Sequence, residues 1–253
     1  MEWREEDGVR WLEADLGGAR AAFSTRLGGV SRPPYDSLNL GLLTEDSGAA
    51  VTENRRRLVA ALGPSFERVV HGRQVHGVDL ARHDTPPPVR SFLGDDNKKE
   101  QASGGLPEVD GHIVSAPGLA PLVFVADCLP VALCGPGGVA MVHAGWRGLA
   151  GGILAAGAGA VGATRAAIGP GIGPCCYEVG DEVLSAFADL GDVAEGRMLD
   201  LPEVARRLLA RAGVGRVESA GLCTGCEAEL FFSHRRDAGR TGRQAGLAWI
   251  EAA

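Results

Sequence analysis

The most constraining feature of this chain is a close succession of strand-like segments in its middle. A turn of sequence GPGG at 135–138 separates two of these segments, which predicts a hairpin. Cys128 and His143 fall at or near strand ends around that hairpin, so little chain entropy opposes bringing them together. The apolar runs typical of buried strands cover 122–125, 131–134 and 139–143.

Elsewhere in the chain, strand and helix patterns alternate and hairpins are frequent. Further strands are expected at 11–16, 19–24, 68–75, 165–168, 217–220 and 243–250, with a Gly-Gly turn between the first two. Helices are expected at 47–62, 149–163, 181–190 and 202–212. We therefore expect an α+β protein whose mixed sheets have helices packed outside them.

The length of the chain limits its domain organisation. With 253 residues and 45% hydrophobic content, the chain can bury a substantial core. We predict a single domain over residues 1–253. Residues 82–107 contain four prolines, several glycines and a mixed charge cluster, which predicts a surface excursion from that domain.

Charge and hydropathy exclude several classes of partner. The net charge is -7 and no long basic stretch is present, which argues against a nucleic-acid partner. The first residues are charged and lack the apolar core of a signal peptide. No apolar run approaches the length needed to cross a bilayer. We expect a cytoplasmic protein without membrane contact, in which six cysteines do not form a disulfide scaffold.

Two histidines and a cysteine are the leading candidates for chemistry. His76 follows the strand expected at 68–75, Cys128 lies in the sequence ADCLP, and His143 begins the sequence HAGWRG. Two imidazoles and one thiolate are a donor set for a catalytic zinc ion that keeps a fourth position for water or substrate. Taken singly, a buried His or Cys is more often structural, and the spacing is not a short-range zinc signature.

The same three residues fit two other classes of site. A thiol beside an imidazole is the nucleophile and base of a cysteine hydrolase, in which Asp127 or another polar group would orient the histidine. Two histidines and one cysteine are also the donors of a blue-copper site, for which Met141 is the nearest axial ligand along the chain. A multicopper cluster needs many more imidazoles than the six histidines present.

Polar residues in turns are candidates for substrate binding. Arg26 and Arg147 lie in glycine-flanked turns, and a guanidinium is suited to bidentate recognition of phosphate or carboxylate. Asn39 could hydrogen-bond a ribose or a base, or it could shape its turn.

The remaining cysteines lie in two later segments. Residues 169–178, GPGIGPCCYE, form a glycine-rich turn that is only a weak phosphate motif. Cys223 and Cys226 have Cys-x-x-Cys spacing, but no second pair matches it. We therefore interpret these two as buried structural thiols rather than half of a zinc site.

Taken jointly and in order, the motifs of this chain resemble one known family over nearly its whole length. It is the YfiH-like family, also labelled polyphenol oxidase or laccase-domain proteins, whose members include purine nucleoside phosphorylases. The matching segments are 25–31 (TRLGGVS), 37–41 (SLNLG), 74–76 (QVH), 110–111 (DG), 126–128 (ADC), 143–148 (HAGWRG), 169–178 and 232–237 (FSHRRD).

The resemblance implies a fold, a metal site and an activity. It implies a layered α/β sandwich with His76, Cys128 and His143 as zinc ligands. It implies phosphorolysis of adenosine, inosine and methylthioadenosine to the free base and ribose 1-phosphate, with adenosine deamination as a further activity. The expected small-molecule partners are purine nucleosides and phosphate, with catalysis assigned to the three ligands and Arg147.

Three alternative functions stay open from the sequence. They are a copper-dependent polyphenol oxidase, a metal-free Cys-His hydrolase, and a nucleotide-binding regulator with structural zinc. The His-x-Glu and Pro-Cys-x-x-Cys signature of zinc nucleobase deaminases is absent, so a deaminating site would be built differently. The sequence ranks neither the nucleosides nor the oligomeric states.

Overall fold

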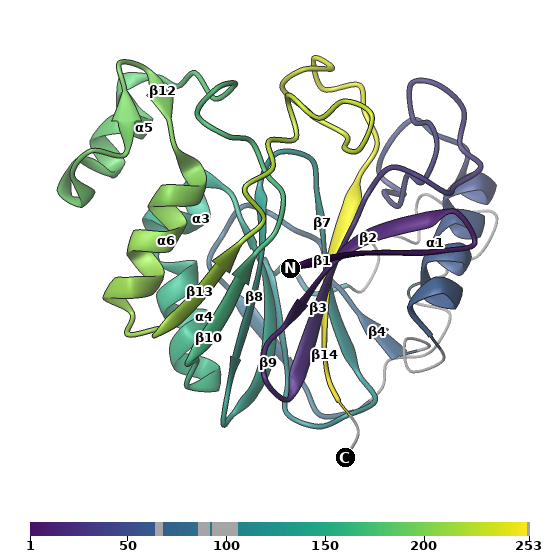
Figure 1. The fold of residues 1–253 in the computed structure, drawn as a ribbon, viewed down its shortest axis with the longest axis horizontal. Helices are drawn as coiled ribbons and strands as arrows, with labels where there is room; N and C mark the ends of the chain where they lie inside the picture. The colour runs from purple at the N-terminus through teal and green to yellow at the C-terminus, as the bar shows by residue number, and fades with distance from the viewer. Residues whose placement is uncertain (64–67, 86–91, 93–105, 252–253) are drawn as a thin grey trace.

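The protein is built around two mixed β-sheets that pack face to face (Figure 1). The computed structural model describes residues 1–63, 68–85, 92 and 106–251. Within that part of the chain, the first six-stranded sheet has the order β1 (Glu2–Glu6), β2 (Val9–Asp15), β3 (Ala19–Ser24), β14 (Gln244–Ile250), β7 (Ala120–Val125) and β4 (Val69–Val70). The second has the order β13 (Arg216–Ser219), β10 (Arg165–Ile168), β8 (Leu129–Gly135), β9 (Gly138–Ala144), β6 (Gly111–Val114) and β5 (Leu80–His83).

Helices cover the outer faces of both sheets (Figure 1). The first sheet is covered by α1 (Gly48–Leu62), whose buried Leu58 packs with residues of β2, β3, β7 and β14. The second sheet is covered by α3 (Trp146–Gly151), α4 (Ile153–Val161) and α6 (Leu201–Arg211). The remaining short elements are α5 (Asp181–Ala186), a 3-10 turn at Ala188–Leu190, and the pair β11 (Ala194–Glu195) and β12 (Met198–Leu199). The predicted α+β fold, a layered sandwich with mixed sheets covered by helices, is confirmed.

The core between the two sheets is made of side chains that alternate along facing strands. Phe23 on β3 and Met141 on β9 are both fully buried there. Gly169 leaves room for Phe23, since a Cβ at position 169 would lie 2.3 Å from the phenyl Cδ1.

Most expected elements form close to their expected bounds, and the differences have physical causes. The strand expected at 68–75 is only β4, because the residues after it leave the sheet and turn their backbone N–H groups toward a carboxylate. The helix expected at 149–163 is two helices, since Gly152 adopts a left-handed conformation (φ 92°) between α3 and α4.

Some elements were not expected at all. The β1 strand is exposed and charged throughout, so it carries no apolar alternation. The surface excursion expected at 82–107 begins inside β5, which pairs in parallel with β6. Most of its residues lie outside the described part of the chain.

Among the helices described, none is both long and apolar enough to span a bilayer.

We predict that Phe23→Ala lowers the free energy of unfolding by about 3–5 kcal/mol, because it leaves a cavity in the core between the sheets. The control Leu43→Ala truncates a side chain that is 70% exposed and should change stability by less than about 0.5 kcal/mol. Urea unfolding of both variants measures the difference. Equal stability of the two variants would contradict this description of the core.

Candidate metal centre

Three donors from distant parts of the sequence meet at one end of the sheets. The Sγ atom of Cys128 and one ring nitrogen each of His76 and His143 all lie within 4.8 Å of one another. His76 lies in the loop after β4, Cys128 between β7 and β8, and His143 near the end of β9. The imidazole of His143 is buried, Cys128 is half-buried and His76 is exposed, so the group opens to solvent on the His76 side.

One buried carboxylate organises two of these segments. Asp110, which precedes β6 and has no exposed surface, accepts backbone N–H bonds from Val75 at 3.1 Å, His76 at 3.0 Å and Gly77 at 2.7 Å. Its Oδ1 atom also lies 2.8 Å from Nδ1 of His143. With Asp110 ionised, Nδ1 is the donor, which leaves Nε2 of His143 as the free ligand atom.

The backbone at the group is held in uncommon conformations. His76 (φ 61°) and Asp127 (φ 90°) have positive φ angles without being glycines. Such angles cost free energy and persist where the surrounding structure enforces them, often at functional sites. At Gly145 the constraint is space rather than the backbone angle. A Cβ there would lie 3.0 Å from Cys128 Sγ and 3.2 Å from His76 Cδ2.

The electrostatics of the group favour charged side chains. Burial opposes ionisation of Cys128, but the neighbouring His143 and His76 outweigh it and lower the pKa of the thiol. Burial likewise opposes a charge on His143, yet the pKa of this imidazole is raised by Cys128 and Asp110. Asp110 is desolvated, and hydrogen bonds from His143 and Gly77 still hold its pKa below the usual value.

This arrangement fits a catalytic metal ion. Two imidazoles and one thiolate are suitable zinc donors, and a carboxylate that fixes the ring of a histidine ligand is a common outer partner of such ions. Met141, the candidate axial ligand under the blue-copper alternative, packs in the core between the sheets, where its Sδ would lie 3.1 Å from a Cβ on Gly246.

Asp127 has a different role from the one expected for a hydrolase. We expected Asp127 or another polar group to orient the histidine, and that group is Asp110. The carboxylate of Asp127 instead accepts the Thr224 hydroxyl at 2.6 Å and the backbone N–H of Arg235 at 2.7 Å. Asp110 belongs to the matching segment 110–111, but no role was predicted for it, because an aspartate before a strand is commonly a turn residue.

Tyr177, for which no role was predicted, is affected by the charges of both Cys128 and Arg147. Arg147 is exposed in the first turn of α3, with its guanidinium 4.3 Å from the ring centre of Trp146. Tyr177 is half-buried, and burial together with the charge of Cys128 raises its pKa to about 12. The guanidinium of Arg235 lies 5.2 Å from the Tyr177 ring centre. The sequence YEVG around Tyr177 offered no chemical pattern that singled it out.

The other two predicted substrate-binding residues already have protein partners. Arg26 donates to the backbone carbonyl groups of Asp36 at 2.6 Å and Ala228 at 3.0 Å, and it borders a 640 Å³ hollow with Arg236 and Arg240. Asn39 is fully buried. Its amide nitrogen donates to Thr44 and Asp46, and its oxygen accepts from Gly41 and Arg243. These contacts support the alternative that Asn39 shapes its turn.

A second group of cysteines corrects the interpretation of the Cys-x-x-Cys pair. Cys223 and Cys226 are not isolated buried thiols, because the neighbouring Cys175 and Cys176 complete a set whose sulfur atoms all lie within 4.8 Å of one another. Cys175 and Cys226 are exposed. The second pair was missed because it has adjacent cysteines and lies about fifty residues earlier in the sequence.

Comparison with known families finds a match over most of the chain. A family described as multi-copper polyphenol oxidoreductase laccase matches residues 20–251. The chain belongs to this YfiH-like, laccase-domain family. The purine nucleoside phosphorylase YfiH of Shigella flexneri is 39% identical to it, over 92% of this chain and 94% of that protein.

Other relatives of this YfiH-like protein agree in sequence and in structure. The purine nucleoside phosphorylase YlmD of Geobacillus stearothermophilus is 37% identical, over 97% of this chain and 96% of that protein. The crystal structure of YlmD from the same organism has a TM-score of 0.83 at 34% identity and covers 99% of both chains. The crystal structure of a hypothetical YfiH protein of Bacillus licheniformis has a TM-score of 0.84 at 32% identity and covers 98% of this chain and 99% of that one.

We predict that Asp110→Asn weakens metal binding at His76, Cys128 and His143 by about 10- to 100-fold, because His143 and the loop at 75–77 lose the carboxylate that fixes them. Competition with a chelator measures the affinity. The control Asp79→Asn changes an exposed aspartate two residues after Gly77 and should leave the affinity unchanged. An unchanged affinity in folded Asp110→Asn protein would show that this carboxylate does not support the metal.

Proposed function

We propose that this protein is a zinc-dependent purine nucleoside phosphorylase. The observation that carries the proposal is the convergence of His76, Cys128 and His143 into a solvent-facing donor group. The exposed Arg147 follows His143 by four residues. The names of the relatives support the same activity. The proposed substrates are adenosine, inosine or methylthioadenosine with inorganic phosphate, and adenosine deamination is proposed as a further activity.

Each residue of the group has a proposed task. His76, Cys128 and His143 would hold the zinc ion, which would act as a Lewis acid toward a bound oxygen atom. Asp110 keeps the proton of His143 on Nδ1 and holds the loop that carries His76. Gly145 allows the backbone to approach Cys128 closely.

The arginines supply the positive charge that phosphate needs. In phosphorolysis a phosphate oxygen forms a bond to C1′ of the ribose while the bond from C1′ to the purine nitrogen breaks. Arg147 is exposed and its guanidinium lies over the Trp146 ring, so its outward N–H groups would bind and orient the phosphate. Arg26 has two nitrogens on backbone carbonyls and its third 3.2 Å from the Asp36 carboxylate, so it would contribute a partly offset positive charge at the wall of its hollow.

Tyr177 is a candidate contact for the nucleoside. Because its pKa is raised to about 12, the phenol stays protonated near neutral pH and can donate a hydrogen bond. Its ring also presents an aromatic face near the charged group, a surface on which a purine can stack.

A specific observation favours a second candidate, a metal-free cysteine hydrolase. The thiol of Cys128 contacts the imidazole of His143, which in turn contacts the carboxylate of Asp110. This is the order of nucleophile, base and orienting carboxylate in a catalytic triad. We rank it second because a second imidazole, His76, also contacts the sulfur, and a nucleophile needs only one base.

One assay tests the proposed function. Protein purified with its metal is incubated with adenosine and phosphate, and adenine and ribose 1-phosphate are measured together with inosine. We expect phosphate-dependent release of adenine, with the activity lost on zinc removal and restored by zinc. Activity that survives chelation and is abolished by iodoacetamide would favour the hydrolase. Elemental analysis that finds copper instead of zinc would favour the oxidase.

We predict that Arg147→Ala lowers kcat/KM for phosphate by roughly 10- to 100-fold, the effect of losing one or two charge-assisted hydrogen bonds. Zinc content should stay at the level of the unaltered protein. The control Arg56→Ala removes an exposed arginine on α1, on the opposite side of the sandwich, and should leave both values unchanged. Loss of zinc in parallel with activity would remove Arg147 from the phosphate site.

A further inference from the structure

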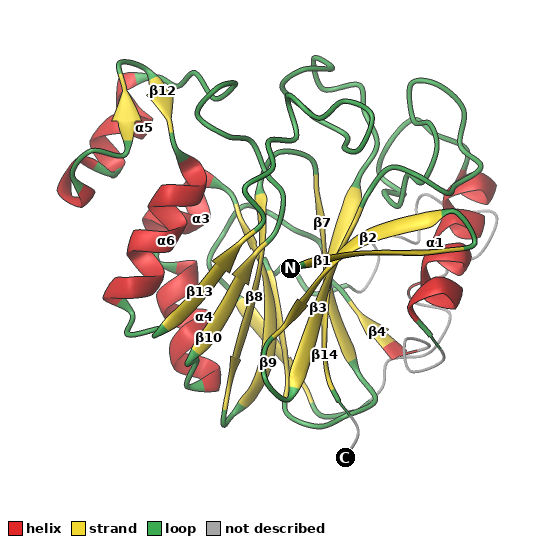
Figure 2. Cartoon of the chain, viewed as in Figure 1, coloured by secondary structure: helices red, strands yellow, loops and turns green. Residues whose placement is uncertain are grey.

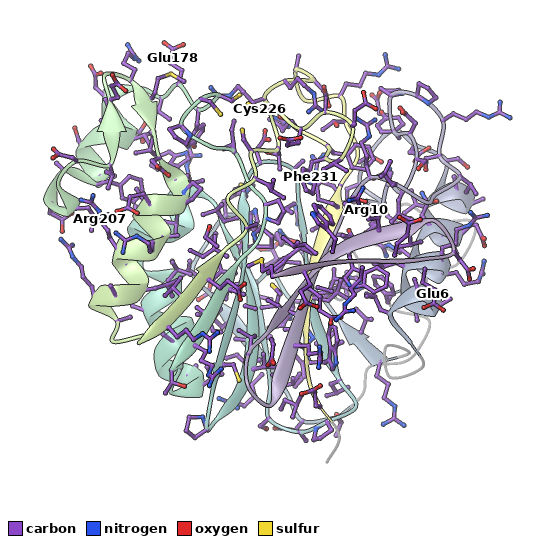
Figure 3. The ribbon with its side chains drawn as sticks, viewed as in Figure 1. Glu6, Arg10, Glu178, Arg207, Cys226 and Phe231 are labelled. Carbon is purple, nitrogen blue, oxygen red and sulfur yellow. The ribbon has the colours of Figure 1, made fainter. Side chains whose placement is uncertain are left out.

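The second cysteine group is a compact cluster formed by two loops. We call it the four-cysteine cluster; it consists of Cys175, Cys176, Cys223 and Cys226. The first two lie in the loop between β10 and α5, and the other two in the loop after β13. Figure 3 shows Cys226 among the loops at the end of the molecule where Glu178 also lies. We propose that this cluster is a second metal site, in which four thiolates bind one zinc ion.

The distances between the sulfur atoms fit one tetrahedral ion. Zinc–sulfur bonds of about 2.3 Å in a tetrahedron place the sulfurs about 3.8 Å apart. In the cluster, Sγ of Cys226 lies 3.3 Å from that of Cys175 and 3.4 Å from that of Cys176, and no pair exceeds 4.8 Å. Four polarisable sulfurs in a tetrahedral set are characteristic of zinc or iron, and zinc needs no redox partner.

Cys223 has a hydrogen bond typical of a thiolate ligand. Its Sγ accepts the backbone N–H of Gly173 at 3.2 Å. An N–H donor on the sulfur stabilises negative charge there, as the outer partners of metal ligands do.

Two glycines leave the space that the sulfurs use. A Cβ at Gly225 would lie 2.9 Å from Sγ of Cys176, and one at Gly173 would lie 3.6 Å from Sγ of both Cys175 and Cys223. Both glycines therefore lie against the sulfurs without a side chain to separate them. The close approach of the two loops supports the cluster separately from the spacing of the cysteines along the sequence.

The four-cysteine cluster is tied to the first metal centre through the backbone and one hydroxyl. Thr224, between two of the cysteines, donates its hydroxyl to Asp127, the residue before Cys128. The backbone N–H of Ile172 donates to the Asp127 carbonyl at 2.8 Å. A metal in the cluster would thus fix both loops that contact Asp127, which gives it a structural role beside the catalytic group.

Metal counting on the full chain tests the proposal. Protein is purified under reducing conditions, saturated with zinc and freed of excess, and zinc per chain is measured by elemental analysis and native mass spectrometry. We expect two zinc ions per chain. Cys175→Ser combined with Cys226→Ser should lose one of them. His76→Ala combined with Cys128→Ser should also lose one and keep the other, so the two sites fail separately.

A matched control and a second measurement complete the test. Cys134→Ser changes the one cysteine outside both groups and should keep both ions. Cadmium-113 NMR of the unaltered sequence should show one resonance in the range of four-sulfur coordination and another in the range of mixed nitrogen and sulfur coordination.

Several results would overturn the proposal. They are a zinc content that Cys175→Ser combined with Cys226→Ser leaves unchanged, no four-sulfur cadmium resonance, and iron in place of zinc at the cluster. A disulfide between two of its cysteines in the zinc-saturated protein would overturn it too. So would alkylation of these cysteines as fast as after denaturation.

Discussion

The carboxylate of Asp110 is the contact on which the candidate centre depends. It joins three consecutive backbone N–H groups of the His76 loop to the imidazole of His143, which belongs to a different strand. A buried carboxylate with four donors is fully satisfied, so its desolvation is compensated and its position is fixed. The same bonds explain why the chain leaves the sheet after β4 and why His76 accepts a positive φ angle.

The sequence predicted the layers and the three donors, but not the contacts that arrange them. Hairpins, buried strands and the glycine-capped helix at 48–62 follow from local patterns, and they form as expected. Asp110 was not selected because its role depends on a loop about 35 residues away. The pairing of Cys175 and Cys176 with the Cys-x-x-Cys turn has the same cause, since only the folded chain brings the two loops together.

The two sulfur-containing groups are joined through Asp127 and their cysteines lie in loops that follow strands of the two sheets, and Figure 2 shows many loops gathered at one end of the molecule. Asp127 links them, because it precedes Cys128 in the chain and receives the hydroxyl of Thr224 from the cysteine turn. Arg235 also donates its backbone N–H to Asp127 and covers Tyr177 with its side chain. Asp127, whose φ angle is positive, therefore helps to position Cys128, Tyr177 and Arg235.

The placement of β14 has a consequence for biosynthesis. This strand comes last along the sequence, yet it lies inside the first sheet, paired with β3 on one side and β7 on the other. While the polypeptide is still emerging from the ribosome, β3 and β7 cannot be bridged, and their facing edges stay open. Those edges are apolar and prone to pairing with other chains. The first sheet can therefore close only after β14 has left the exit tunnel, long after β3 and β7 have been made.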